Sequence, residues 1–329
     1  MKKLYPLLAL LIFINHKIYS QYSSPLEYYV QEIIPTEIAW IHDDLSGVTI
    51  NKTNNCLYMI ENDEGKIWRL DSDINYIQTI LGGQFGDEED LVYLNYNNYA
   101  IVTEEGDLYI GSLDIGDNNI NPDDFQKITF SEHNGNNGAE GVAYDSLNHI
   151  FYIVKEKDPM AFYSFQRPDH ENDTTVSVNI PFDADNIFSG IMEDLSSITF
   201  DYRTNRVLIL SDDSRKIIDV DPSNGFIFGE FFIEGMEQPE GLCFLNNYDL
   251  LIVGEPNFYT IYSDISLFGD LNYDGHINQY DLEIIIDYLF IYTNLSEFQI
   301  TDIDLDYNQI IDVFDLLLFV EVFDNYDQR

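Results

Sequence analysis

The sequence has few basic residues, and this shortage excludes two classes of partner. Its 329 residues include 15 Lys plus Arg against 59 Asp plus Glu, a formal net charge of −44 at pH 7. Nucleic acids and anionic membranes are bound by basic protein surfaces, so we expect neither as a direct partner. Divalent cations are the counter-charge that such a composition favours.

Cysteine and histidine are also scarce. Only Cys56 and Cys243 occur, with no spacing typical of a disulfide framework, and we interpret both as buried small residues. The six histidines are scattered, and no Ser-His-Asp order, P-loop, HExxH or CxxC pattern is present. The sequence therefore contains no motif of a common catalytic site.

Long apolar runs are missing after the first twenty residues. At the start, Lys2 and Lys3 precede an apolar run from Leu4 to Ile14, and Ser20 stands at a suitable cleavage point. The run is too short to span a bilayer, which favours a secretory signal peptide over residues 1–20 rather than an uncleaved anchor. We expect a secreted, extracellular or cell-surface protein, with the periplasm as the alternative location.

Apolar and aromatic residues are plentiful, at 45% hydrophobic with 24 Tyr and 22 Phe, so we expect a packed core despite the acidity. Within the mature chain, one pattern of short apolar strands and polar turns returns five times, as in "LSGVTINKTNNCLYMIENDEGKIWRLD". One residue near the start of each copy serves as its marker: Ser46, Glu89, Glu140, Ser196 and Glu240. Successive markers lie between 43 and 56 residues apart. All-strand repeats of this length predict an all-β, five-bladed propeller, with six blades as the alternative.

Acidic residues recur at one position of this repeat. Fifteen or sixteen residues after each marker stand Glu61, Glu104, Glu156, Asp212 and Glu255, and three markers are themselves acidic, Glu89, Glu140 and Glu240. Equivalent positions of propeller blades form a ring around the axis, so up to eight carboxylates are expected near one end of the channel. Such a ring suits Ca²⁺, which prefers oxygen ligands. The alternative is that these acids only end strands and hydrogen-bond to turns.

Several segments carry a more specific resemblance. The segments "IENDEGKIWRLD", "AEGVAYD", "VKEKDP", "LSDDSRKI" and "PEGLCF" resemble the SdiA-regulated, YjiK-like propeller family. The resemblance implies a five-bladed propeller over residues 21–264, with bound calcium and no established catalytic activity. Residues 26–35 are then expected to form the strand that completes the last blade.

Two acidic loops follow the propeller region, and the first reads "GDLNYDGHINQYDL". Both loops have the ligand spacing of an EF-hand, including a backbone carbonyl at the seventh position. The first loop would bind calcium through Asp270, Asn272, Asp274, His276, Asn278 and Asp281. The second would use Asp304, Asp306, Asn308, Ile310, Asp312 and Asp315. Gln309 replaces the usual glycine at the sixth position of the second loop, which should weaken that site.

Each loop runs into an apolar, helix-like stretch, and this duplication resembles a type I dockerin over about residues 267–326 within a domain of residues 265–329. The resemblance implies a small α-helical domain that needs Ca²⁺ to fold and that docks to a cohesin-like module. The alternative is a calcium-stabilised cap that docks nothing.

Two functions remain open from the sequence. The first is a secreted calcium-binding propeller acting as a non-catalytic binding or scaffold module, held by its tail to a cohesin-like or cell-surface scaffold protein, with a carbohydrate or other small ligand at the propeller face. The second is a calcium-dependent hydrolase of phosphoesterase, esterase or lactonase type in the axial channel. Basic residues that could hold an anionic substrate are sparse near the ring, which favours the first function.

Overall fold

The computed structural model describes residues 24–42, 44–62, 65–81, 85–113, 116, 119–130, 138–264, 271–272, 278–291, 303 and 311–326. The expected signal peptide, residues 1–20, lies outside this part. The chain divides into two compact units: the larger comprises residues 30–201 and 205–264, and the smaller includes residues 265–329. None of the described helices has the length and apolar character needed to cross a membrane.

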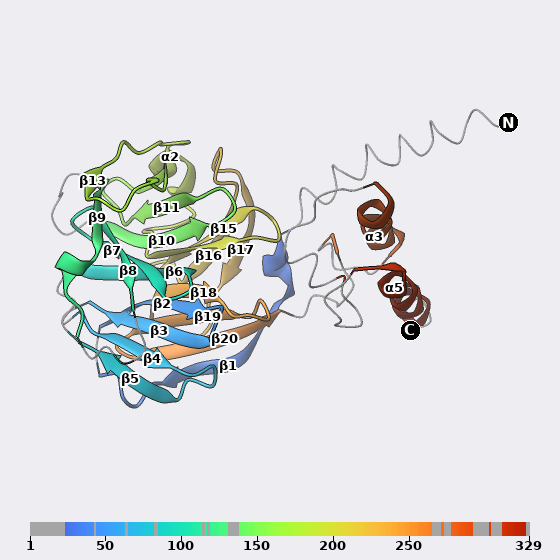
Figure 1. Cartoon of the computed structure of the whole chain (residues 1–329), viewed down its shortest axis with the longest axis horizontal. Coiled ribbons are helices and arrows are strands. Elements are labelled where there is room, and N and C mark those ends of the chain that lie inside the picture. The colour runs from blue at the N-terminus through green and yellow to red at the C-terminus, as the bar shows by residue number, and fades with distance from the viewer. Residues whose placement is uncertain are drawn as a thin grey trace. The chain divides into compact units, whose positions relative to one another are not determined.

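The larger unit consists of five sheets, which we call blades 1 to 5 (Figure 1). Blade 1 contains β2 (Leu45–Asn51), β3 (Cys56–Glu61), β4 (Ile67–Leu70) and β5 (Tyr76–Ile80). Blade 2 contains β6 (Glu88–Asn95), β7 (Asn98–Thr103), β8 (Asp107–Ser112), β9 (Gln126–Thr129) and β13 (Thr174–Thr175). Blade 3 contains β10 (Ala139–Asp145), β11 (Ile150–Lys155) and β12 (Ala161–Gln166). Blade 4 contains β14 (Ser197–Asp201), β15 (Arg206–Ser211), β16 (Lys216–Val220) and β17 (Ile227–Phe232). Blade 5 contains β18 (Gln238–Phe244), β19 (Leu250–Glu255), β20 (Phe258–Asp264) and β1 (Tyr29–Glu37).

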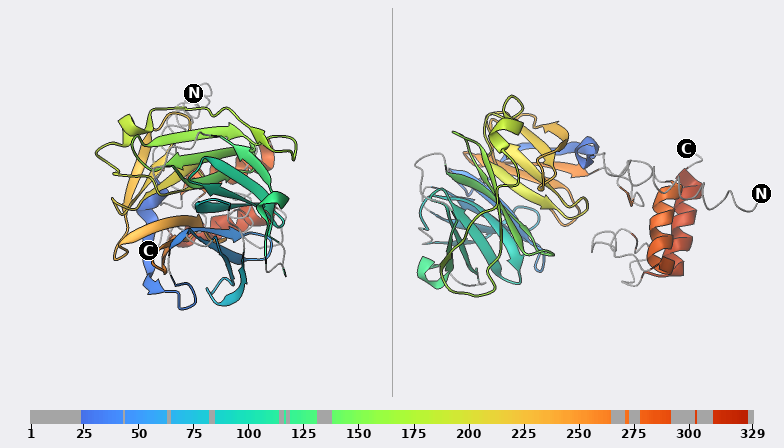
Figure 2. Two further views of the ribbon diagram at one scale, coloured as in Figure 1. Left: turned by 90° about the vertical axis from the view of Figure 1, so that its left-hand side faces the viewer. Right: turned by 90° about the horizontal axis from the view of Figure 1, so that it is seen from above.

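The blades form a closed ring around one axis (Figure 2). The first strands β2, β6, β10, β14 and β18 contact one another in that order, and β18 contacts β2 again. The N-terminal strand β1 pairs with β20 at the outer edge of blade 5, as the sequence predicted. The five-bladed propeller is therefore confirmed, and the six-bladed alternative is wrong.

The cores of the propeller lie between neighbouring blades. Val48 and Met59 of blade 1 pack with Leu251 and Val253 of blade 5 in one buried cluster. A second cluster joins blades 2 and 3, and a third joins blades 1 and 2. Central strands such as β3 and β15 are buried along their whole length, because a blade is covered on both faces. Cys56 and Cys243 are buried and free, as expected.

The long insertions between repeats contribute to the blades. β9 follows the 3-10 helix η2 (Pro122–Asp124), and β13 pairs parallel with β9 at the edge of blade 2. After β13, the short helix α2 (Ala184–Phe188) contacts β12, with Phe188 fully buried. These insertions therefore include edge strands and a covering helix.

In the smaller unit, the helices α3 (Gln279–Ile291) and α5 (Val313–Tyr326) pack on each other. Their shared core consists of the fully buried Leu271, Ile285, Ile303 and Phe319. The 3-10 helix η1 (Pro25–Tyr28) also belongs to this unit. Seven of the predicted calcium ligands lie outside the described residues: Asp270, Asp274, His276, Asp304, Asp306, Asn308 and Ile310.

Candidate functional site

A β-bulge explains how the marker residues reach the axis of the propeller. In four blades, the pairing of the first strand with the second skips one residue, which is Ser46, Glu89, Glu140 or Glu240. A bulge leaves the extra residue unpaired and re-aims its side chain. In blade 4 the marker, Ser196, directly precedes β14. The recurrence seen in the sequence therefore reflects one repeated local geometry.

The second recurring position lies at the end of the second strand of each blade: it follows the strand in blades 1 to 4 and is its last residue in blade 5. The backbone N–H of Glu104 donates to the carbonyl of Asp87 at 3.0 Å, and that of Glu156 donates to Gly138 at 3.1 Å. In blade 5, Glu255 pairs with Gln238 in the same manner. Each of these residues thus stands opposite the residue two places before the marker, at one end of the channel.

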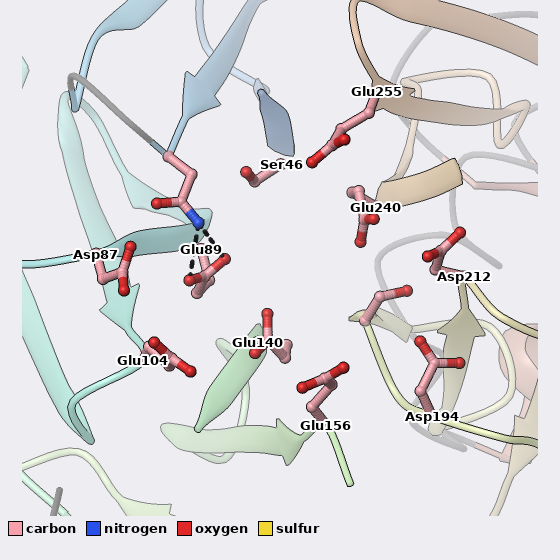
Figure 3. Close-up of a pocket in the computed structure, with 12 residues that line it drawn as sticks. Ser46, Asp87, Glu89, Glu104, Glu140, Glu156, Asp194, Asp212, Glu240 and Glu255 are labelled. Carbon is pink, nitrogen blue, oxygen red and sulfur yellow. Dashed lines mark hydrogen bonds between the residues drawn. The ribbon is translucent and has the colours of Figure 1, made fainter. Parts of the chain in front are cut away.

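These positions surround a cavity of about 300 Å³, which we call the acidic basin (Figure 3). Its lining consists of Ser46, Asn62, Asp87, Glu89, Glu104, Glu140, Glu156, Asp194, Ser196, Asp212, Glu240 and Glu255. Nine of these twelve residues are carboxylic acids, and all five blades contribute. Seven of the eight acids that the sequence assigned to the ring line the basin: Glu89, Glu104, Glu140, Glu156, Asp212, Glu240 and Glu255.

The eighth predicted acid, Glu61, does not line the basin, and that assignment is corrected. Glu61 pairs with Leu45 inside the sheet, so the following residue, Asn62, takes the position held by acids in the other blades. The Glu61 carboxylate instead accepts a hydrogen bond from Lys66 Nζ at 2.9 Å and one from Trp68 Nε1 at 3.4 Å. A spacing of either fifteen or sixteen residues could not distinguish the two neighbours.

Two basin acids were missed by the sequence reasoning, Asp87 and Asp194. Both stand two residues before a marker, and blade 1 also has an acid there, Asp44. This recurrence in three of the five repeats is a sequence signal that could have identified them. Carboxylate oxygens of Asp87, Glu89 and Glu104 lie within 4.8 Å of one another. One Ca²⁺ with oxygen ligands at about 2.3–2.6 Å could contact all three.

Asparagine 62 holds one of these carboxylates in place. Its Nδ2 donates to both oxygens of Glu89, at 3.0 and 3.1 Å (Figure 3). Glu89 also shares a side-chain hydrogen bond with Glu140 of the next blade. Blades 1, 2 and 3 are thereby connected through Glu89.

Burial and mutual repulsion raise the pKa of several basin acids. Burial, followed by the charges of Asp87 and Glu104, raises the pKa of Glu89 to about 9. Burial and a hydrogen bond with Asp87 raise the pKa of Glu104 to about 7, and burial and the charges of Asp194 and Asp213 raise the pKa of Asp212 to about 7. Burial, followed by the charges of neighbouring basin acids, raises the pKa of Glu140 and Glu240 well above the usual range. The fully ionised basin is thus unfavourable without a counter-charge.

Basic side chains supply little of that counter-charge. At the rim, Lys157 Nζ lies 2.5 Å from Glu156 and 3.6 Å from Asp213. Two other lysines near the ring point elsewhere: Lys155 donates to the carbonyl of Pro159 at 3.1 Å, and Lys216 pairs with Glu230 at 2.8 Å. One rim lysine offsets a small part of nine carboxyl groups, whereas an all-oxygen lining fits Ca²⁺.

The C-terminal loops place their described residues in one repeated arrangement. Asp281 Oδ2 accepts from the backbone N–H of Asn278, whose own side chain accepts from Tyr280, at 2.8 and 2.9 Å. Asp312 and Asp315 form the same pair before α5, at 2.8 Å. Asp281 Oδ1 also accepts from the backbone N–H groups of Leu271 and Asn272. Both helices thus begin with a capping box, and calcium ligation by these residues stays a prediction.

Both the fold and the sequence of this chain are similar to those of known proteins. Solved structures similar to this chain include a luciferin-regenerating enzyme, with a TM-score of 0.49 and 9% identity over 71% of this chain and 96% of that one. A gluconolactonase from Xanthomonas campestris has a TM-score of 0.46 and 9% identity, over 72% of this chain and 92% of that one. A nidogen/laminin complex has a TM-score of 0.45 and 12% identity, over 65% of this chain and 73% of that one. The SdiA-regulated family matches residues 22–263, which cover all five blades. The chain therefore belongs to the SdiA-regulated family.

Proposed function

We propose that the protein is an exported calcium-binding propeller that acts as a non-catalytic binding or scaffold module. The observation that carries this proposal is the acidic basin, in which nine carboxylic acids from blades 2 to 5 line one cavity of about 300 Å³. The lining offers oxygen donors throughout, and the spacing of Asp87, Glu89 and Glu104 matches what one cation can bridge.

Repulsion among the basin acids gives the cation its energetic role. Without a counter-charge, the pKa of Glu89 is about 9, so this side chain keeps its proton at neutral pH. A bound Ca²⁺ would favour the ionised forms and join side chains from different blades. Calcium would therefore stabilise the closed ring, and a carbohydrate or other small ligand could share its coordination at the open end.

The C-terminal unit supports the attachment part of the proposal. Its two helices begin with equivalent capping boxes, as a duplicated loop-helix module requires. Calcium in both loops would complete the fold of this unit, and the dockerin resemblance assigns it a cohesin-like or cell-surface scaffold partner. The apolar side chains of Val313, Phe314 and Leu317 are half or more exposed on α5 and are available for such a contact.

Calorimetric titration of the full chain with Ca²⁺ tests the proposal. Glu140→Gln combined with Glu240→Gln should remove one binding component, because both side chains line the basin and the double variant replaces two of its nine carboxyl groups. Glu61→Gln is the matched control, since Glu61 is a buried acid of the same repeat that faces away from the basin, and it should keep all components. Identical titrations of the parent and the double variant would overturn the proposal.

A calcium-dependent hydrolase is the second candidate, favoured by one observation. The pKa values of Glu104 and Asp212 are raised to about 7, where a general base or acid works best at neutral pH. A screen of phosphomonoesters, esters and lactones with and without Ca²⁺ separates the two functions. Calcium-dependent turnover that is lost in Asp212→Asn would establish the hydrolase, and no turnover on any of these classes would support the binding module.

A further inference from the structure

The residues that follow the five markers form a ring below the acidic basin. They are Gly47, Asp90, Gly141, Ser197 and Gly241. The strands approach closely here: a Cβ on Gly47 would lie 2.5 Å from Asp90 Oδ1, and one on Gly141 would lie 2.7 Å from Ser197 Cα. A Cβ on Gly241 would lie 3.0 Å from Gly47 Cα. The axis at this level has room for the side chains of Asp90 and Ser197 because the other three residues are glycines.

The carboxylate of Asp90 connects four of the five first strands. Its Oδ2 accepts from the backbone N–H of Val142 in β10 and from Ser197 Oγ in β14, both at 3.2 Å. Its Oδ1 accepts from the backbone N–H of Leu91 in its own strand at 2.8 Å. The backbone N–H of Val48 in β2 is a further donor to this carboxylate.

Ser197 extends the same network to the remaining blade. Its hydroxyl oxygen accepts from the backbone N–H of Leu242 in β18 at 3.2 Å, while its proton goes to Asp90. Asp90 is 2% exposed and Ser197 is fully buried. These two side chains therefore link the inner strands of all five blades.

We propose that Asp90 and Ser197 form an axial plug that closes the central channel and sets the spacing of the inner strands. The bulged markers directly precede residues of this ring, and the plug sets the spacing of the strands that carry them, so the plug also positions Glu89, Glu140 and Glu240 at the floor of the basin. The basin is then a blind cavity that ligands enter from one end. Asp90 and Ser197 are positioning residues, because they act on cation binding only through the placement of the basin acids. That effect on cation binding rests on the proposed function, whereas the plug itself does not.

The composition of the ring is explained by this role. Glycine in a strand gives up side-chain packing, and a buried carboxyl group is costly unless hydrogen bonds satisfy it. Four donors satisfy Asp90, and three glycines admit it to the axis. An axis filled by apolar side chains would need neither the three glycines nor the four hydrogen-bond donors.

Hydrogen exchange of the full chain tests the plug without any metal. Asp90→Asn replaces one acceptor by a donor, and Ser197→Ala removes the bridge to blade 5. We expect amide exchange to quicken about tenfold or more at Val142 in Asp90→Asn and at Leu242 in Ser197→Ala, because each amide loses a buried acceptor. Asp219→Asn is the matched control. Asp219 lies on β16, away from the axis, and is fully buried, where it pairs with Arg206 of β15 at 3.2 Å.

Exchange at Val142 and Leu242 that matches the Asp219→Asn control would overturn the plug. If Asp90→Asn does not fold, Ser197→Ala alone decides, because it removes only one hydroxyl group. The positioning role has its own readout, which is the calcium component that Glu140→Gln with Glu240→Gln removes. Its affinity should fall about tenfold in both plug variants and stay unchanged in Asp219→Asn.

The outcomes separate the two proposals. Quickened exchange with unaltered calcium affinity would refute the positioning role. A parent protein with no basin component at all would refute the proposed function, and exchange would still decide whether the plug exists.

Discussion

The acidic basin and the C-terminal helix pair are both built from acids at repeated positions, but these acids have opposite surroundings. In the basin, carboxylates face one another, and burial with repulsion raises the pKa of Glu89 to about 9. At the starts of α3 and α5, Asp281 and Asp315 accept backbone N–H groups that would otherwise lack a partner. An acid that recurs in a sequence therefore acquires its role from the donors that the fold places around it.

The two regions also differ in how much core supports them. The propeller has extended apolar clusters between its blades, whereas the described core of the helix pair consists of Leu271, Ile285, Ile303 and Phe319. Small domains with such cores commonly need a metal to fold. Calcium removal should therefore affect the two regions very differently.

The largest expected effect is the loss of the helix pair on chelation. With excess EDTA, α3 and α5 should unfold while the propeller strands remain, because only the propeller has a core large enough without metal. Circular dichroism at the helical minimum and amide NMR spectra would follow the two regions in the full chain. A helical signal that EDTA leaves unchanged would contradict the calcium dependence of the helix pair.

A smaller effect is expected from pH on the calcium-free propeller. The pKa of Glu89 rises from 4.5 to about 9 on folding, so the folded state binds more protons than the unfolded state between these values. Stability must then fall as pH rises from about 5 to 9, and the midpoint of unfolding should drop by about 5 °C or more. Saturating Ca²⁺ should remove this dependence in scanning calorimetry, and an equal slope with and without Ca²⁺ would refute a cation in the basin.

Replacing an acid by its amide should change stability in opposite directions in the two regions. Glu140→Gln replaces a buried acid that folding must protonate or hold charged beside other acids, and it keeps a donor for Glu89, so it should stabilise the calcium-free propeller by about 1 kcal/mol. Asp281→Asn removes a carboxylate oxygen from the capping box and weakens a predicted calcium ligand, so it should destabilise the calcium-loaded helix pair by about 1 kcal/mol or more. Calorimetric unfolding transitions report both values, and a destabilised calcium-free propeller in Glu140→Gln would contradict the repulsion.

The smallest effect is expected for Glu61→Gln. This substitution weakens the contact with Lys66 but leaves the basin intact, so stability should change by less than about 1 kcal/mol. Calcium affinity should not change. A lowered affinity in Glu61→Gln would place Glu61 in the site and contradict the strand register described above.

The sequence predicted the architecture and most of the basin, because both depend on recurrence. Strand patterns repeat at similar intervals, and the bulge gives the markers of four blades the same direction, so seven acids were assigned correctly to one cavity. Glu61 was wrong because a shift of one residue along β3 turns a side chain to the other face. The plug could not be foreseen, because Asp90 and Ser197 meet only when distant blades close around the axis.

Anomalous diffraction from crystals of the full chain soaked in Tb³⁺, a calcium substitute, tests the central claim most directly. The account predicts a peak within the basin, about 2.3–2.6 Å from carboxylate oxygens that include those of Asp87, Glu89 and Glu104, and its loss in Glu140→Gln with Glu240→Gln. Peaks at the C-terminal loops with none in the basin would contradict the claim that the propeller is itself a cation-binding module.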